Sequence, residues 1–255
     1  MSFTPEGMVY FDYLQRLWVL SDDFASRIAA LRDDTEKRAV IGGPAVYVET
    51  VVTEAVMKLK RLRPDFRIRI KSAPLEELIG MSEEGKLNCF ISTSDRLPEN
   101  FTRICVKNER IYLVIPAEDP INAELTDYRV NPGEIGRCFD YSVLNRKQFV
   151  FLEENQPLQK MADAFFREYG IEPVNSITVD QVSTAVNLSM KGAGICFASE
   201  ESLEGNLRLD GVCVYPLPPE VSGRSIYVAY DRELYQTEAC RQLIQLLAAG
   251  QGGSI

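Results

Sequence analysis

The stretch SITVDQVSTAVNLSMKGAGICFA, residues 176–198, decides the fold class because it reads as strand, helix, turn and strand in succession. The run up to Val179 predicts a strand, and Asp180 caps a helix that continues to about Lys191. Gly192-Ala193-Gly194 then turns the chain into a second apolar strand. A helix that connects two strands is typical of parallel strands with the helix on the face of their sheet. The stretch therefore predicts an α/β architecture.

The same alternation of strands and helices continues on both sides of this stretch. Short apolar runs with period two are typical of strands, and longer runs with apolar residues three and four apart are typical of helices. We expect mostly parallel sheets covered by helices, with an irregular span at 117–147. The predicted strands are 39–41, 67–71, 87–92, 111–115, 149–152, 176–179, 195–198, 212–217 and 225–230, and the predicted helices are 45–61, 75–82, 157–169, 180–191 and 237–248.

The first segment of the chain predicts one long helix ahead of the α/β region. Thr4-Pro5-Glu6 combines a capping hydroxyl, a proline suited to the first helical position and an acid in the first turn. Residues then recur at alternating spacings of four and three, which is a heptad pattern with one polar member. The pattern consists of Tyr10, Leu14, Leu17, Ser21, Phe24, Ile28 and Leu31, and a charged run at 32–38 ends it.

Two interpretations of this helix are open. It is either an amphipathic helix packed on its own domain or a helix that pairs with its copy in a second chain. Three heptads are the lower limit of a coiled-coil signal. We favour pairing, because the helix precedes the α/β region and has little of its own chain to pack on. The expected dimerisation residues are Tyr10, Leu14, Leu17, Phe24, Ile28 and Leu31.

Composition and charge exclude several classes of function. The 255 residues include no histidine, which removes Ser-His-Asp and Cys-His nucleophile systems and the commonest acid–base residue. The six cysteines are scattered without a CxxC pair, so we expect reduced thiols, no metal site and no cofactor. The net charge of −9 disfavours contact between these residues and DNA phosphates. Neither a membrane-spanning apolar run nor a secretory signal is found, so we expect a cytoplasmic protein with no membrane contact.

Several motifs, taken in order along the chain, resemble those of LysR-type transcription regulators. Phe3-Thr4-Pro5-Glu6-Gly7 resembles the L-T-x-x-G segment after the family's winged helix-turn-helix, and the heptad helix resembles the family's linker helix. The most specific match runs from Val179-Asp180 to Gly192-Ala193-Gly194-Ile195 and resembles V-x-x-G-x-G-I. Further matches, which extend the resemblance to about Ala248, are Ile41-Gly42, Arg63-Pro64, Gly85-Lys86-Leu87-Asn88-Cys89-Phe90-Ile91, Ile111 to Pro116 followed by Asp119-Pro120, and Ile226 to Tyr230.

The resemblance implies an α/β effector-binding domain of two Rossmann-like lobes joined by two crossover strands, similar to type 2 periplasmic binding proteins. It places the linker helix at 1–38, lobe I at 39–115 plus 218–255, and lobe II at 116–217. A small-molecule effector is expected in the cleft between the lobes, and the chain is expected to form a homodimer or homotetramer. The family's winged helix-turn-helix is not among these residues, so DNA contact is expected only through that missing domain. The expected protein is a regulator and not an enzyme.

Candidate effector contacts lie at the carboxyl ends of strands, where ligands of open α/β sheets bind. Gly42-Gly43 before a predicted helix is either a cradle of free N–H groups for an anion or only a tight turn. Family members often have Ser or Thr at this place, where an effector carboxylate docks. Here the residues are Gly43, Pro44, Ala45 and Val46, which puts a carboxylate effector in doubt.

Glu153-Glu154-Asn155-Gln156 holds the equivalent place in lobe II. Two carboxylates facing a cleft would suit an amine, a hydroxyl or a sugar, and the alternative is a solvated pair at a helix start. Three further residues line the cleft by resemblance, and each is equally interpretable as a capping or turn residue. The complete set of candidate effector contacts is Gly43, Pro44, Ala45, Val46, Ser72, Thr93, Glu153, Asn155 and Gln181.

The chain also departs from the family pattern. The usual Asp of the third-strand motif is Asn88 and the usual His before Pro120 is Asp119, and we interpret both as drift. Cys196 and Cys213 are candidates for a redox switch, although buried thiols are the simpler interpretation. Two alternatives to a regulator stay open. One is a stand-alone solute-binding protein, which would need export, and the other is an enzyme such as a dehydratase on the same scaffold.

Overall fold

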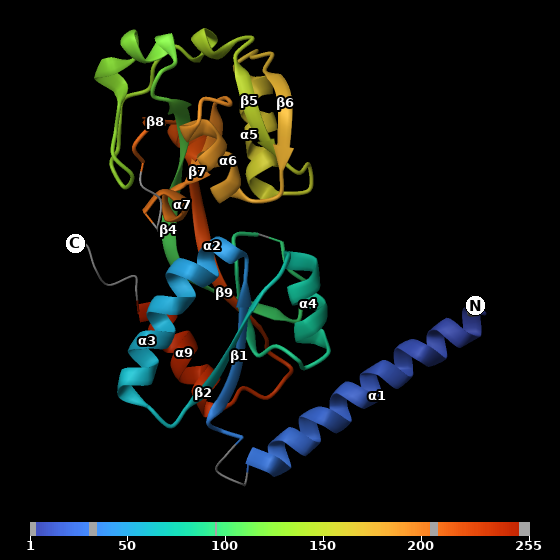
Figure 1. Cartoon of the computed structure of the whole chain (residues 1–255). Helices are drawn as coiled ribbons and strands as arrows, with labels where there is room; N and C mark the ends of the chain where they lie inside the picture. Colours follow the sequence, from blue (N-terminus) through green and yellow to red (C-terminus); the bar gives the residue numbers. More distant parts are fainter. Residues whose placement is uncertain (1–3, 31–34, 95, 205–208, 250–255) are drawn as a thin grey trace. The chain divides into compact units, whose positions relative to one another are not determined.

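The computed structural model of the 255-residue chain describes residues 4–30, 35–94, 96–204 and 209–249. The chain divides into two compact units, which are unit 1 (residues 1–107 and 226–255) and unit 2 (residues 108–225). Two long strands, β4 (Phe101–Pro116) and β9 (Gly223–Asp231), each contribute residues to both units (Figure 1). They are the two crossover strands that the resemblance implied. The sequence placed only residues 111–115 of β4 in a strand and missed its first half.

Unit 1 is built on parallel strands that are extended by antiparallel ones. β1 (Arg38–Gly43) pairs in parallel with β2 (Arg67–Ser72) on one side and with β3 (Cys89–Ser92) on the other. β9 lies antiparallel to β3, and β4 follows β9 in the order of the sheet. The expectation of mostly parallel sheets is therefore correct for β1 to β3 and wrong for the crossover strands. β1, β2 and β3 run in the same direction because helices connect them, whereas β9 enters unit 1 from the other unit.

Helices cover both faces of the unit 1 sheet (Figure 1). On one face lie α9 (Glu238–Ala248) and a continuous helical segment formed by α2 (Ala45–Tyr47), the π-helical η1 (Val48–Val52) and α3 (Thr53–Leu62). On the other face lies α4 (Leu75–Glu83). The central strands of the unit 1 sheet are thus covered by helices on both faces, as in doubly wound α/β folds, whereas the edge strand β2 is largely exposed.

The π-helical turn has a side-chain cause. Thr50 Oγ1 donates to the carbonyl of Val46 at 2.9 Å, and Thr53 Oγ1 donates to the carbonyl of Val48 at 2.7 Å. A hydroxyl that occupies a carbonyl of the preceding turn competes with the backbone N–H for that acceptor. Wider turns of this kind are frequent at functional sites, and this one follows the candidate contacts at residues 43–46.

Unit 2 combines the second half of β4 with two strands that flank it and two further strands that pair with each other. β7 (Cys196–Ser199) and β8 (Val212–Pro216) both lie antiparallel to β4. β5 (Gln148–Leu152) and β6 (Val174–Val179) are parallel to each other, and a bridge between Phe149 and Ile195 links β5 to the start of β7. The helices of unit 2 are α5 (Pro157–Glu168), α6 (Val182–Met190), α7 (Glu200–Glu204) and α8 (Pro219–Ser222), with the 3-10 turns η2 (Pro120–Ala123), η3 (Thr126–Tyr128) and η4 (Tyr141–Leu144).

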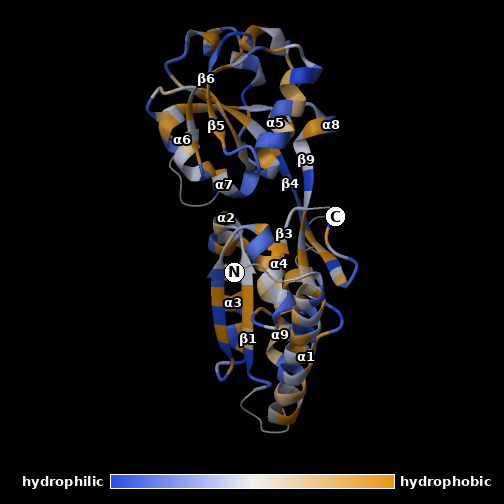
Figure 2. Cartoon of the chain, turned by 90° about the vertical axis from the view of Figure 1, so that its right-hand side faces the viewer, coloured by the Kyte–Doolittle hydropathy of each residue, from blue (hydrophilic) through white to orange (hydrophobic). Residues whose placement is uncertain are grey.

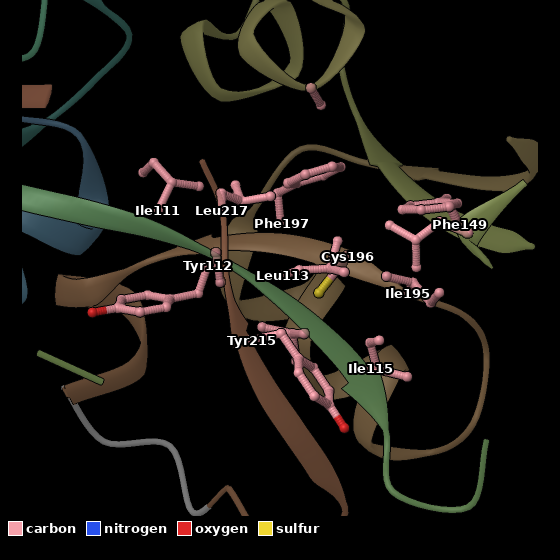
Figure 3. Packing of buried hydrophobic residues seen from close by; sticks show 14 of the residues in the cluster. Ile111, Tyr112, Leu113, Ile115, Phe149, Ile195, Cys196, Phe197, Tyr215 and Leu217 are labelled. Carbon is pink, nitrogen blue, oxygen red and sulfur yellow. The ribbon is translucent and has the colours of Figure 1, made fainter. Parts of the chain in front are cut away.

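The core of unit 2 combines aliphatic side chains with a cluster of aromatic rings, and Figure 3 shows Phe149 and Phe197 among them. The ring of Phe149 packs edge-on against Phe166 with centroids 4.9 Å apart, and it stacks on Phe197 at 5.9 Å. Phe165 packs edge-on against Phe197 at 5.6 Å. Such pairs add about 0.5–1.5 kcal/mol each beyond the burial of their surface, so this cluster fixes α5 on β5 and β7.

The stretch at 176–198 folds as strand, helix and strand, with one correction. Gln181 occupies the N-cap position of α6, and no side-chain capping hydrogen bond forms there, so the prediction that Asp180 caps the helix was wrong. Gly194 has φ +150°, and a Cβ atom on it would lie 2.9 Å from the carbonyl oxygen of Gln148. The glycine lets Ile195 N reach that carbonyl at 2.8 Å, so the turn serves close backbone packing.

Candidate functional site

The strand-end residues of unit 1 lie at one edge of its sheet. β1 and β2 are parallel and in register, so Gly43 lies opposite Ser72, and the N–H of Ala73 donates to the carbonyl of Gly43 at 3.3 Å. β3 is parallel to β1 and ends at Ser92, so Thr93 leaves the sheet at the same edge. The fold therefore brings the three predicted strand-end positions of unit 1 to the edge where parallel strands present their carboxyl ends.

The glycine pair before α2 is explained first by packing. A Cβ atom on Gly42 would lie 2.5 Å from Leu78 Cδ2, and one on Gly43 would lie 3.2 Å from Ile91 Cβ. This geometry favours the tight-turn interpretation over an anion cradle. The turn still presents two backbone donors. The N–H groups in the first turn of a helix, here those of Ala45 and Val46, have no intrahelical acceptor. Pro44, Ala45 and Val46 are half-buried, so a ligand can approach them.

The strand-end residues of unit 2 also share one edge. Leu152 lies opposite Val179 in the parallel pair of β5 and β6, and the N–H of Glu153 donates to the carbonyl of Val179 at 3.1 Å. Gln181 follows two residues after Val179, so Glu153 and Gln181 leave neighbouring strands at the same place. The side chains of Glu153, Asn155 and Gln181 are exposed there.

Two glutamines that the sequence analysis left out hold this edge in place. Gln156 Nε2 donates to the carbonyl of Asp180 at 2.7 Å, which ties the segment after β5 to the segment after β6. Gln159 is buried, and its Oε1 accepts the N–H of Leu152 at 2.8 Å. An amide shortly after a strand is a weak signal, because the same residue occurs on any solvated helix start. Only the fold shows that these amides position Glu153.

The edge of unit 2 is acidic. Glu153 and Glu154 are both exposed, and in the part of the chain that the structure describes neither forms an ion pair. A carboxylate at this position accepts hydrogen bonds and attracts positive charge, and it repels anions. The arrangement can therefore hold a ligand that carries hydroxyl or amino donors.

Unit 1 has a comparable pair of hydroxyl groups next to Thr93. Ser92 is buried, and its Oγ accepts the N–H of Ser94 at 3.0 Å, which forms a turn directly after β3. Ser94 Oγ in turn donates to the carbonyl of Arg96 at 2.9 Å. These contacts shape the turn that presents Thr93. The sequence analysis did not select Ser92 or Ser94, because a serine in a turn is common.

Two cavities lie elsewhere. One of about 160 Å³ in unit 1 lies between the first helix, α1 (Pro5–Ala30), and the start of β1, and one of about 300 Å³ in unit 2 is lined in part by Arg110, Tyr112 and Pro216. None of the nine candidate effector contacts lines either cavity. The candidate contacts therefore rest on their position at the strand ends of each unit.

The two positions interpreted as drift have structural roles. Asn88 Oδ1 accepts the N–H of Val40 at 2.7 Å and its own N–H donates to the carbonyl of Val40 at 2.9 Å, so Asn88 joins β3 to β1. Asp119 Oδ1 accepts the N–H of Ile121 at 3.0 Å and the Nζ of Lys147 at 2.9 Å. Asp119 thus caps η2 and anchors the residue before β5.

Cys196 and Cys213 are poorly placed for a redox switch. Cys196 lies opposite Val114 on one side of β4, and Cys213 lies opposite Ile115 on the other side. Two strands separated by a third are about 9.5 Å apart, which exceeds the Cα separation of roughly 7 Å that a disulfide spans. Burial also raises the pKa of the Cys196 thiol to about 12, and Figure 3 shows its sulfur among apolar side chains. These observations favour a packing role.

The helix α1 turns its heptad residues away from the rest of unit 1. On this heptad face, Leu17 is 44% exposed and Phe24 is 64% exposed. Figure 2 shows hydrophobic residues that recur along the helix. The half-buried residues Val19, Asp23 and Ser26 are spaced four and three apart and lie on the opposite face of the helix. This face contacts unit 1, since the N–H of Tyr235 donates to Asp23 Oδ1 at 3.0 Å.

This arrangement is the one expected if α1 pairs with a second chain, and that pairing stays a prediction. An amphipathic helix packed on its own domain would bury its apolar face there, whereas α1 presents Tyr10, Leu14, Leu17, Phe24 and Ile28 to solvent. Thr4 Oγ1 accepts the N–H of Gly7 at 3.1 Å, which confirms the predicted helix start. Leu31 lies outside the described residues.

Within the described ranges, no three His, Cys, Asp or Glu side chains gather in a way that could hold a metal ion. In the same ranges, no helix has both the length and the hydropathy that crossing a bilayer requires.

Comparison with known proteins identifies similar domains. The profile of the family described as "LysR substrate binding domain" matches residues 32–252. A hydrogen peroxide-inducible genes activator from Pectobacterium carotovorum subsp. carotovorum is 22% identical over 180 residues, which are 71% of this chain and 56% of that protein. The chain thus spans about half the length of this relative.

Solved structures share the fold at low sequence identity. The BenM effector-binding domain with its effector benzoate has a TM-score of 0.66 and 18% identity, covering 86% of this chain and 95% of that one. The regulatory domain of CcmR from Synechocystis PCC6803, in complex with 2-PG, has a TM-score of 0.68 and 12% identity, covering 83% and 96%. At these identities the likeness concerns the fold.

Proposed function

This chain belongs to the LysR substrate-binding domain family, and on that premise we propose that it senses a small molecule and couples its binding to the arrangement of a dimer. The observation that carries the coupling is the orientation of α1, whose heptad face points away from its own unit. A DNA-binding domain ahead of α1 would then read out the dimer arrangement. The whole regulator, its DNA and its effector are part of the proposal.

The strand-end edges of both units support the effector site. The proposed contacts in unit 1 are the turn at 43–46 with Ser72 and Thr93, and those in unit 2 are Glu153, Asn155 and Gln181. Parallel strands end at each edge, and ligands of α/β sheets bind outside such ends. The BenM and CcmR domains were solved with the small molecules benzoate and 2-PG, which supports a small-molecule ligand for this fold. A cleft shared by the two lobes stays a prediction from the resemblance.

The chemistry of these edges favours a polar ligand that is neutral or cationic. The turn at 43–46 offers backbone N–H groups without a hydroxyl side chain. Glu153 offers an exposed carboxylate on a backbone segment that the Gln156 and Gln159 hydrogen bonds hold in place. A carboxylate recognises hydroxyl and amino donors and disfavours anions. We therefore expect an amine, a polyol or a sugar rather than an organic acid.

A thermal-shift screen against a metabolite library, grouped by charge, tests this proposal. A ligand at a hundred times its Kd stabilises the folded state by about 2.7 kcal/mol, which shifts the melting temperature measurably. For a hit, Glu153→Gln should weaken binding about tenfold, because a hydrogen bond to a charged group contributes roughly 1.5–3 kcal/mol. Glu168→Gln is the matched control, since Glu168 is an exposed carboxylate at the far end of α5.

Three outcomes would speak against the proposal in different ways. Hits confined to anions would contradict the ligand class. Equal weakening by the Glu153 and Glu168 substitutions would contradict the strand-end site. Turnover of a hit into a product would favour the alternative of an enzyme on the same scaffold.

A further inference from the structure

The segment between β9 and α9, residues 232–237, ties the ends of the two crossover strands together. Asp231, the last residue of β9, is buried, and its Oδ2 accepts Asn100 Nδ2 at 2.7 Å. The N–H of Arg232 donates to the carbonyl of Asn100 at 3.0 Å. Asn100 immediately precedes β4. A displacement of either crossover strand at this end therefore displaces the segment.

Asp231 also fixes the shape of the segment. Its Oδ1 accepts the N–H of Glu233 at 2.9 Å, and its carbonyl accepts Gln236 Nε2 at 3.2 Å. Thr237 closes the segment, because its Oγ1 accepts the N–H of Cys240 at 3.2 Å and donates to the carbonyl of Arg38 at 2.7 Å. The segment is thus a rigid connection between β9, β1 and α9.

Tyr235, in the middle of the segment, contacts both α1 and the connection from α1 to β1. Its N–H donates to Asp23 Oδ1 of α1 at 3.0 Å, and its hydroxyl donates to Glu36 Oε1. Glu36 Oε2 accepts the N–H of Glu238 at 2.6 Å at the start of α9, where the helix dipole favours a carboxylate. The same oxygen lies 3.4 Å from an Arg241 guanidinium nitrogen.

The contact between α1 and unit 1 is narrow. The cavity of about 160 Å³ lies under the helix and is lined by Val19, Asp22 and Ser26 of α1 and by Leu87 and Asn88 of the body. Most described side chains of α1 are exposed, and Val19, Asp23 and Ser26 are half-buried on the face that meets the body. Reorienting α1 would therefore cost little apolar burial, so a polar contact such as that of Tyr235 with Asp23 can influence its direction.

We propose that Tyr235 is the coupling residue that transmits the position of the crossover strands to α1, through its bonds to Asp23 and Glu36. The inference rests on the proposed coupling of ligand binding to dimer arrangement and names the residues that would carry it. Coupling between distant groups requires an element whose arrangement both of them bias. The segment at 232–237 meets this requirement, because Asn100 and Asp231 hold one end and α1 holds the other.

Distances between spin labels on Gln15→Cys in α1 and Glu76→Cys in α4 test the coupling without any ligand. The chain carries Cys105→Ser, Cys138→Ser and Cys213→Ser, which removes the cysteines that are not fully buried. An excess of unlabelled chain ensures that only distances within one chain are read. The labelled chain with an unmodified segment 232–237 should give a single narrow distribution of the distance between the two labels. Tyr235→Phe and Asp23→Ala should each broaden it, because the first removes the hydroxyl that donates to Glu36 and the second removes the acceptor of the Tyr235 N–H. Tyr230→Phe, which removes another tyrosine hydroxyl of unit 1, should leave it narrow.

The decisive variant is Asn100→Ala, because Asn100 is tied to Asp231 and the segment rather than to α1. The proposal expects Asn100→Ala to broaden the distribution. In a chain that carries both Asp23→Ala and Tyr235→Phe, which together remove the two bonds of the proposed route, Asn100→Ala should broaden it no further. An unchanged distribution in Asn100→Ala alone, or further broadening by Asn100→Ala in the chain that carries the other two substitutions, would overturn the proposal. Equal broadening by Tyr230→Phe would also overturn it. Because no ligand is present, these results leave the ligand-binding proposal unaffected.

Discussion

Individual residues of this chain show how local geometry selects side-chain chemistry, and Gly194 is the sharpest case. We predict that Gly194→Ala destabilises the protein by about 2 kcal/mol, because the backbone is at φ +150° and the new Cβ would press on the carbonyl of Gln148. Gly80→Ala is the control, since Gly80 lies in α4 with open space at its Cβ position. That substitution should stabilise by about 0.5–1 kcal/mol. Urea unfolding of both variants measures the difference, and equal shifts would contradict it.

The cysteines differ in reactivity because they differ in burial. We predict that a thiol reagent at pH 8 labels Cys138 first, since it is exposed, and labels the buried Cys89 and Cys196 far more slowly. Burial raises the pKa of Cys196 to about 12, so its thiolate fraction at pH 8 is very small. Mass spectrometry of peptides after short exposure reads the order, and unfolded protein should label at all positions. Rapid labelling of native Cys196 would contradict the packing role and reopen the redox interpretation.

At the residue scale, much of the candidate site was predictable from the sequence. Gly43, Ser72, Glu153 and Gln181 follow recognisable strands, and the rule that parallel strands end at one edge places them correctly. The contacts that hold them were not predictable. Gln159 reaches back to Leu152 N across a turn whose geometry exists only in the fold.

At the scale of elements, the crossover strands contain a buried ion pair that the sequence did not indicate. Arg224 Nε in β9 lies 2.6 Å from Glu109 Oε1 in β4, and the Glu109 side chain is fully buried. We predict that Glu109→Gln destabilises by about 2–3 kcal/mol, because it removes the charge that Glu109 sets against Arg224 in a mostly dry environment.

Lys58 and Glu54 provide a matched control for that pair. They also approach to 2.6 Å, but both side chains are more than half exposed on α3. Glu54→Gln should change stability by less than about 0.5 kcal/mol, because solvent screens the pair. Similar losses in thermal unfolding of the two variants would show that burial does not decide the strength of the Glu109 pair.

Element boundaries show where sequence patterns are reliable and where they are not. Apolar runs identified β1, β5 and β7 because these strands are buried on both faces. The first half of β4 was missed because residues 101–110 mix charged and apolar side chains without a clean period of two. The start of α6 was misassigned to Asp180, since an acid before a helix is a preferred cap but the backbone gives that position to Gln181.

At the scale of the whole molecule, the account depends on α1. Alternating spacings of four and three predicted its apolar face from the sequence, but could not tell whether that face packs on its own domain. The structure places Val19, Asp23 and Ser26 against unit 1 and leaves Leu14, Leu17 and the rest of the heptad face exposed. An apolar stripe of this length on a free helix is costly in water, so we expect a second chain to cover it.

The measurement that tests this central claim most directly is the molar mass of the chain by light scattering, compared between the unmodified chain and Leu17→Glu with Phe24→Glu. We predict a dimer or larger assembly for the unmodified chain. The double variant should be a monomer with an unchanged circular dichroism spectrum, because in the seam the new carboxylates of one chain would be buried against those of the other. Gln15→Glu, which adds a charge to α1 away from the seam, should keep the assembly. A monomeric unmodified chain, or a double variant that keeps the full mass, would contradict the claim that α1 pairs two chains.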